Sequence, residues 1–291
     1  MRAIEFFESI SIKGKEKGKS FRCVANSERS STCKLGTTAL VLAGMLGYVE
    51  GKPAVEKKYK TLISDYTSYI LSSQKSQGAS KGGFRHEYRT SKGFGDEESP
   101  FSNGEALLAL VRVYQLNATA DVKVAIDNSF NYLKHKAYDN SLYLWIMAAL
   151  KDMQNLWPND EYITYTRDFT VWRMANKPYV KDRNVCAYVE GVASAYSVLA
   201  SKPLTGELSN LHKEIDALNA YHKRLQLSEN DVYRVFKKSE DGLSVGALFE
   251  PTRAKGGFIT AHSNVTQRID FTQHCVSTYV QTLVDIDGKS L

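Results

Sequence analysis

The chain has 291 residues, of which 43% are hydrophobic, and this composition excludes a disordered or fibrous protein. Its 38 Lys and Arg residues against 32 Asp and Glu residues give a formal charge of +6, which favours acidic partners without requiring nucleic acid. We expect a soluble protein without a visible signal peptide, because the longest apolar run, Ala39 to Leu46, is far shorter than the ~18 residues of a membrane span, and the N-terminus lacks a continuous apolar segment.

The pattern along the chain predicts an N-terminal arm followed by one large helical domain. Residues 1–31 are rich in Lys, Ser and Gly, and residues 21–25 are expected to form a short strand. Residues 32–291 form the expected domain, in which apolar residues recur at helical spacing with almost no strand pattern. The expected helices cover residues 37–48, 55–73, 103–116, 121–135, 141–156, 161–174, 184–199 and 204–227, and a last one starts near residue 270.

Two stretches of the chain share the order helix, Gly-Gly-Phe, polar arm, helix. Gly82-Gly83-Phe84 begins the first arm and Gly256-Gly257-Phe258 the second, and we expect positive φ at Gly83 and Gly257 if the arms share one turn. One helical hairpin cannot bury its apolar face alone, so repeated units must stack. The pattern predicts an all-α fold, an α/α toroid with short β-hairpin arms and helix ends around a cleft. Nine expected helices are fewer than the twelve of a six-hairpin ring, so the ring is partial or part of a longer chain or complex.

The four cysteines are too few and too scattered for a disulfide scaffold. Cys23 and Cys33 could pair if oxidised, but we expect free thiols. The sequence contains no dinucleotide-binding, P-loop or zinc-protease motif, and we therefore expect no cofactor and no metal.

Two of the expected helices carry candidate acid–base groups. Glu190 lies on a stripe of small and polar residues, where it either faces a cleft or pairs with a neighbouring base on a wet face. Asp270 and His274 lie four residues apart, so the carboxylate can orient the imidazole for proton transfer. The alternative is that Asp270 only caps its helix and satisfies His274. Arg268, just before them, could hold a carboxylate through two hydrogen bonds.

Glu105 has a structural explanation, because Ser102-Asn103-Gly104-Glu105 fits a capping box at a helix start. The polar residues of the first arm, among them Arg85 and Tyr88, would be solvent-exposed unless the arm folds over a cleft.

The chain resembles the C-terminal helical domain of D-glucuronyl C5-epimerases and, more broadly, six-hairpin enzymes that act on uronic-acid polysaccharides. The resemblance covers roughly residues 80 to 285. It rests on Gly82-Gly83-Phe84, on the run from Ser102 to Tyr114, on Tyr188-Val189-Glu190-Gly191, and on the run from Arg268 to His274, in that order. Two positions depart from the pattern. Phe271 stands where an epimerase would carry Tyr, and Lys177-Pro178 precedes Tyr179 where a Glu-Tyr pair is expected, so that only Tyr179 carries over.

The resemblance and the residues together predict a carbohydrate-active enzyme for an acidic, uronate-containing polysaccharide, similar to a glucuronyl C5-epimerase. The phenyl ring of Phe271 cannot exchange a proton. The alternatives are therefore a hydrolase, a lyase, or a non-catalytic module that binds a glycan or a protein. The expected catalytic residues are Glu190, Asp270, His274 and Tyr179, and the expected substrate-binding residues are Arg268, Arg183, Tyr188, Arg85 and Tyr88.

Overall fold

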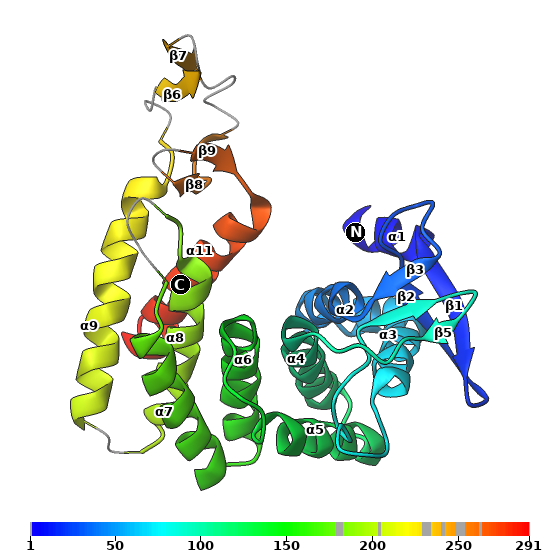
Figure 1. Cartoon of the computed structure of the whole chain (residues 1–291). Helices are drawn as coiled ribbons and strands as arrows, with labels where there is room; N and C mark the ends of the chain where they lie inside the picture. The colour runs from blue at the N-terminus through cyan, green and yellow to red at the C-terminus, as the bar shows by residue number, and fades with distance from the viewer. Residues whose placement is uncertain are drawn as a thin grey trace. The chain divides into compact units, whose positions relative to one another are not determined.

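The computed structural model describes residues 2–178, 183–202, 205–228, 234–239, 242–247, 254–261 and 264–290. The chain forms two compact units, Met1–Pro158 and Asn159–Leu291 (Figure 1). Each expected helical segment contains a helix, with bounds within a few residues of the prediction. In the described residues, every helix is too short or too polar to cross a membrane.

The first unit begins with the short helix α1 (Arg2–Ser9) and an antiparallel hairpin of β1 (Ser11–Glu16) and β2 (Lys19–Val24). The expected strand is confirmed in β2, whose Phe21 and Cys23 point into the core in the alternating pattern of a half-buried strand. A second small sheet joins β3 (Thr32–Lys34), β4 (Glu87–Arg89) and β5 (Gly93–Phe94), so that the first arm forms the expected hairpin.

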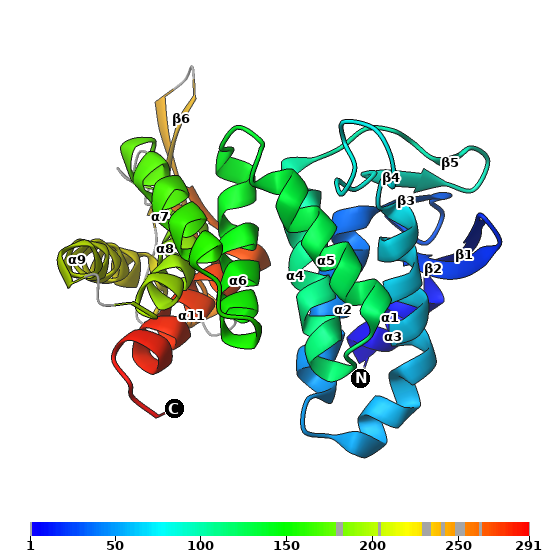
Figure 2. The ribbon, with the colours of Figure 1, turned by 90° about the horizontal axis from the view of Figure 1, so that it is seen from below.

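Five helices make the core of this unit. They are α2 (Leu35–Val49), α3 (Pro53–Ser73), α4 (Pro100–Leu116), α5 (Ala120–Leu133) and α6 (Asn140–Leu156). Helix α4 packs against α2, α5 and α6 (Figure 2), and nearly every residue of its first three turns is buried. Its Gly104 allows the close approach to α6, because an added Cβ would lie 2.7 Å from Cβ of Trp145.

The second unit is built around α8 (Cys186–Leu199). It packs against α7 (Asp160–Ala175), α9 (Thr205–His222) and α11 (Ile269–Gln281) (Figure 2). A 3₁₀ turn η1 (Lys223–Leu225) follows α9, and a π-helical turn η2 (Thr282–Ile286) follows α11.

Two hairpins join α9 to α11. They consist of β6 (Arg234–Ser239) with β7 (Gly242–Ala247) and β8 (Ile259–Ala261) with β9 (Asn264–Gln267). The first hairpin was not expected from the sequence. The pair Asp241-Gly242, which favours tight hairpin turns, was the available signal.

The predicted repeat is confirmed by matching hydrogen bonds in the two arms. Gln74 Nε2 donates to the carbonyl of Gly82 at 3.2 Å, and Gln226 Nε2 donates to that of Gly256 at 3.2 Å. The first glycine of each pair has positive φ, +96° at Gly82 and +81° at Gly256. The expected positions, Gly83 and Gly257, were therefore wrong by one residue.

The second glycine of each pair leaves room for a neighbouring side chain, which is a rigid ring in the first arm and a flexible amide end in the second. An added Cβ at Gly83 would lie 2.6 Å from the Tyr132 ring, and one at Gly257 would lie 2.6 Å from the Gln267 amide. One glycine provides the conformation and the next allows the close approach.

The arms also attach to the following helix in the same way. The amide of Phe84 donates to Asn103 Oδ1 at 2.8 Å in the first unit, and the amide of Phe258 donates to Thr272 Oγ1 at 3.1 Å in the second. Both phenylalanines are fully buried. This correspondence aligns the early turns of α4 and α11.

The prediction of free thiols is wrong. Cys23 bonds to Cys33, which joins β2 to β3, and Cys186 bonds to Cys275, which joins the start of α8 to α11. The sequence could not show the second pair, because its cysteines lie 89 residues apart and meet only when the two helices pack.

Candidate functional site

Helices α8 and α11 bring a carboxylate and an imidazole into direct contact. His274 Nδ1 lies 2.6 Å from Glu190 Oε2, and the two residues are only 9% and 7% exposed. The expected partner of His274 was Asp270, four residues away on the same helix. The structure places Glu190 at its Nδ1 instead, 84 residues away in sequence.

The second carboxylate oxygen is also held. Ser277 Oγ donates to Glu190 Oε1 at 2.6 Å, and Gln281 Nε2 donates to Ser277 Oγ at 3.2 Å. Ser194 Oγ then donates to Gln281 Oε1 at 2.9 Å. The polar stripes visible in the sequence of the two helices thus face each other, and their hydrogen bonds fix the orientation of the Glu190 carboxylate.

The start of α8 is fixed by three further contacts near this pair. The disulfide between Cys186 and Cys275 lies next to His274 in sequence, and Asn184 Oδ1 accepts a hydrogen bond from the amide of Cys186 at 3.0 Å. His222 Nε2 accepts one from the amide of Val185 at 3.0 Å. Burial lowers the pKa of His222 to about 4, so this imidazole is neutral and its acceptor nitrogen is available. Nothing in the sequence distinguished His222.

Asp270 is engaged by Arg268. The guanidinium donates twice to the carboxylate, Nε to Oδ1 at 3.0 Å and Nη2 to Oδ2 at 2.6 Å, and it also lies 4.7 Å from the ring centre of Phe271. Partial burial would raise the pKa of Asp270, but these hydrogen bonds and the charge of Arg268 outweigh it and hold the pKa below its ordinary value. Asp270 and Arg268 are therefore an exposed ion pair at the start of α11.

The other expected residues of this unit lie in different environments. Arg183 is exposed just before α8, and the described residues provide no ion-pair partner for it. Tyr188 is 4% exposed, with the Arg173 guanidinium 4.7 Å from its ring centre, and burial raises its pKa. Tyr179 lies outside the described residues.

In the first unit, Arg85 and Tyr88 have structural partners. Arg85 donates to the carbonyls of Ser72 and Ser73 at the end of α3, where a cation is favourable, and it lies 4.4 Å from the ring centre of Phe94. Tyr88 is 7% exposed and packs edge-on against Phe21 with 5.0 Å between ring centres. The arm is therefore packed on the unit and is not the exposed segment that the sequence indicated.

The capping box expected at Glu105 is wrong. Helix α4 starts earlier, with Ser99 as its N-cap and Pro100 in its first turn, so Glu105 lies in the second turn. It is 9% exposed, and burial raises its pKa to about 7. The sequence signal failed because Pro100 starts the helix before Ser102 can cap it.

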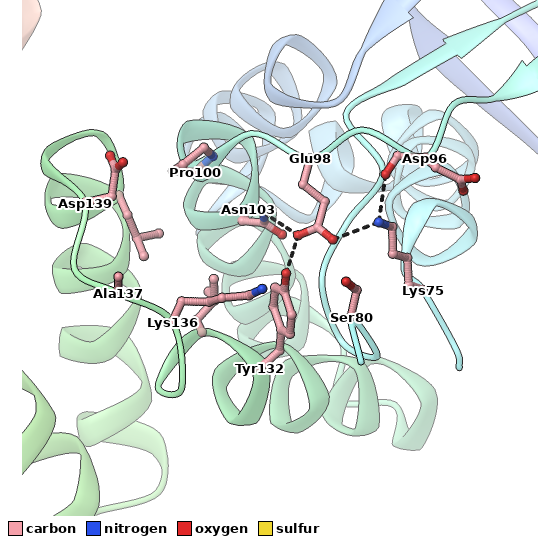
Figure 3. Close-up of a pocket in the computed structure, with 12 residues that line it drawn as sticks. Lys75, Ser80, Asp96, Glu98, Pro100, Asn103, Tyr132, Lys136, Ala137 and Asp139 are labelled. Carbon is pink, nitrogen blue, oxygen red and sulfur yellow. Dashed lines mark hydrogen bonds and ion pairs between the residues drawn. The ribbon is translucent and has the colours of Figure 1, made fainter. Parts of the chain in front are cut away.

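A pocket of about 430 Å³ lies in the first unit between the arm, α4 and the loop before α6 (Figure 3). Figure 3 shows Glu98 at its centre, bonded by Lys75 Nζ at 2.8 Å and by the hydroxyl of Tyr132 at 2.6 Å. Burial opposes ionisation of Glu98, but these partners outweigh it and lower its pKa. Lys136 lies beside Tyr132, 4.4 Å from its ring centre. Glu98 and Lys75 thus form an ion pair at this pocket, with side chains that are each 19% exposed.

The sequence matches no protein-family model and no curated protein. Solved structures do resemble it. The GH76 α-mannanase of Bacteroides thetaiotaomicron matches with a TM-score of 0.57 and 10% identity, over 94% of this chain and 75% of that one. The cellobiose 2-epimerase of Spirochaeta thermophila matches with a TM-score of 0.56 and 10% identity, over 86% of each chain. A D-mannose isomerase matches with a TM-score of 0.57 and 10% identity, over 91% of this chain and 77% of that one. At this identity the likenesses establish the fold alone, and the α/α-toroid fold predicted from the sequence is confirmed.

Proposed function

We propose that the chain is a carbohydrate-active enzyme in which Glu190 and His274 form the acid–base pair. The observation that carries the proposal is the buried 2.6 Å contact between His274 Nδ1 and Glu190 Oε2. Three solved enzymes that share the fold act, by their names, on mannan, cellobiose and mannose. A fold hosts many functions, so the proposal depends on the pair and takes the fold as support.

The pair is suited to moving a proton. A neutral imidazole that donates from Nδ1 to a carboxylate has its basic lone pair on Nε2, and the carboxylate compensates the charge that the ring acquires when it takes a proton. Ser277, at 2.6 Å from the other carboxylate oxygen, prevents Glu190 from rotating away. Hydrolysis usually requires two carboxyl groups on either side of a glycosidic bond. A carboxylate joined to an imidazole favours proton abstraction from a sugar carbon, as in epimerisation or elimination.

The substrate class that we propose is an acidic sugar, as the likeness to glucuronyl C5-epimerases implies. A proton next to a carboxylate is removed more easily when a cation neutralises that carboxylate. Arg268 is already paired with Asp270 through bonds of 3.0 and 2.6 Å, which leaves Arg183 as the better candidate for this role. Arg183 precedes Asn184, whose Nδ2 lies 3.3 Å from Cys275 Sγ, beside His274 in sequence.

The proposal is tested with uronate-containing polysaccharides in D₂O. Deuterium at C5 of the uronate indicates epimerisation, ultraviolet absorbance of an unsaturated product indicates elimination, and new reducing ends indicate hydrolysis. His274→Gln should abolish turnover while the melting temperature stays near that of the wild type, because Gln can still donate to Glu190. His212→Gln is the matched control, since His212 forms a similar pair with Asp216 at 3.6 Å but is 39% exposed.

Two results would contradict the proposal. Unchanged turnover in His274→Gln rules out His274 as the base. Binding of a polysaccharide without any of the three products identifies a non-catalytic module.

A charge test addresses the substrate class. Arg183→Gln should raise KM for a uronate polymer and leave KM for its carboxyl-reduced form unchanged, whereas Arg268→Gln should affect both little. Equal effects of Arg183→Gln on the two polymers would exclude its role in binding the carboxylate.

A further inference from the structure

Glu105 is a buried carboxyl group without a partner. Its side chain extends from α4 and is 9% exposed, and the part of the chain that the structure describes gives it no hydrogen bond and no ion pair. Among the described residues the other buried carboxylate, Glu190, is held by His274 and Ser277. The half-buried Glu98 is held by Lys75 and Tyr132. Neither oxygen of Glu105 is among the fully enclosed side-chain atoms without a partner, so water or a ligand from outside the chain can reach the carboxyl group.

Space is kept for this carboxyl group by a glycine on the neighbouring helix. An added Cβ at Gly36, in the first turn of α2, would lie 2.0 Å from Glu105 Oε2 and 3.3 Å from Ser102 Oγ. Because Gly36 has no side chain, the Glu105 carboxyl group can lie directly against the backbone of α2.

The neighbouring hydroxyl group belongs to a further polar contact. Ser102 Oγ lies 2.9 Å from His86 Nδ1 on the first arm. A carboxyl, a hydroxyl and an imidazole therefore gather at the start of α2. Glu105, Ser102 and His86 are called the Glu105 cluster below.

The internal repeat places this cluster at a meaningful position. Asn103 and Thr272 bind their arms through equivalent hydrogen bonds, at 2.8 and 3.1 Å. Two residues further along each helix stand Glu105 and His274. Each side chain lies against the early turns of an earlier helix of its own unit, Glu105 at Gly36 of α2 and His274 at Glu190 of α8. The same turn of the repeat thus carries a titratable group in both units.

We propose that the Glu105 cluster is a second sugar-binding site, contained in the first unit, in which the Glu105 carboxyl group hydrogen-bonds a hydroxyl of the ligand. A sugar hydroxyl both donates and accepts, as the three groups of the cluster do. The described residues contain no group of three His, Cys, Asp or Glu side chains that could hold a metal ion. The choice of a sugar rests on the proposed function.

Ionisation of Glu105 predicts how the site selects ligands. Burial alone raises the pKa of Glu105 to about 7, and no charged side chain contributes to the shift. His86 is the other titratable member of the cluster. A neutral sugar can bind to either form of Glu105, as donor or as acceptor, but a uronate is repelled by the ionised form.

The test measures dissociation constants of D-glucose and D-glucuronate by ligand-observed NMR at pH 6 and pH 8.5. In the full-length wild type, D-glucuronate should bind about tenfold or more weakly at pH 8.5, while D-glucose changes little. Glu105→Gln should remove this difference, because the amide cannot ionise. Repeating the titrations in the His274→Gln background keeps the second unit's pair from contributing.

Two glycine variants form a matched control that does not change the carboxyl group. Gly36→Ala places a methyl group against Glu105 and should weaken both sugars. Gly44→Ala, in the same helix with no atom within 4 Å of the added Cβ, should leave both unchanged. Melting temperatures verify that each variant folds.

The outcomes separate this inference from the proposed function. Sugar binding with the same pH dependence in wild type and Glu105→Gln overturns the inference only. Equal effects of Gly36→Ala and Gly44→Ala also overturn it. A wild type that binds neither sugar also overturns the inference, while the proposed function is decided separately by the turnover assays on polysaccharides.

Discussion

Replacing Glu105 with Gln should change the stability of the protein relative to wild type in a pH-dependent way, with a larger gain for the variant at neutral pH than at acidic pH. Burial raises the pKa of Glu105 from its ordinary 4.5 to about 7. A group whose pKa is raised in the folded state contributes stability below its unfolded pKa and loses it as the pH rises through the folded value. Between its ordinary pKa of 4.5 and its pKa of about 7 in the folded protein, ionisation of Glu105 costs about 3 kcal/mol of unfolding free energy.

Between pH 5 and pH 8, the difference in unfolding free energy between Glu105→Gln and wild type should grow by about 2 kcal/mol in favour of the variant. Urea denaturation at four pH values in this interval measures it, and the slope is insensitive to any constant effect of the amide. Glu98→Gln is the control. The pKa of Glu98 is lowered, so its carboxylate is ionised throughout the interval and its loss should shift stability by a constant amount. Parallel curves for Glu105→Gln and wild type would refute the account of a buried, protonatable carboxyl group.

Other perturbations have outcomes of their own. Burial lowers the pKa of His222 from 6.5 to about 4. The stability that the neutral imidazole contributes is therefore complete above pH 6.5 and is lost, by up to about 3 kcal/mol, as the pH falls through 4. His222→Gln should lose less unfolding free energy than wild type between pH 7 and pH 4, and an unchanged slope would show that the imidazole does not titrate. Replacing Cys186 and Cys275 with Ser opens a loop of 89 residues and should lower the unfolding free energy by about 4 kcal/mol. Urea denaturation of the variant and the wild type measures this loss. A loss below about 1 kcal/mol would mean that helix packing alone holds α8 on α11. Gly82→Ala should lower the melting temperature more than Gly256→Ala. Both glycines have positive φ, but only at Gly82 would an added Cβ meet a backbone atom, the carbonyl oxygen of Asn128 at 2.1 Å. Equal losses of melting temperature would leave backbone strain as the only cause.

Local patterns in the sequence were sufficient for the helices and for the repeat. Apolar spacing placed the segments of α2 to α9, and the two Gly-Gly-Phe stretches identified arms that are built with the same hydrogen bonds. The β6–β7 hairpin was missed because its strands are short and their apolar residues are few. Turn chemistry at Asp241-Gly242 was the stronger signal there.

Contacts between distant residues were not visible in the sequence. Asp270 was assigned to His274 because they lie four residues apart, yet Arg268 holds Asp270 and Glu190 holds His274. The polar stripes on the two helices were recognised, but a stripe gives no information on which other stripe it faces. The pairing of Cys186 with Cys275 was hidden for the same reason.

The two copies of the repeat differ most where chemistry would be expected. Their glycines, arms and buried phenylalanines are equivalent, and these features serve the backbone. At the turn that carries Glu105 in one copy and His274 in the other, Glu105 lies against Gly36 without a hydrogen bond among the described residues, whereas His274 contacts the Glu190 carboxylate. A position that only filled the core would more easily have kept an apolar residue, since burying a titratable group is unfavourable. The repeated backbone thus presents the same turn with two different ionisable groups, one compensated within the chain and one not. This contrast is why we assign proton transfer to His274 and ligand binding to Glu105.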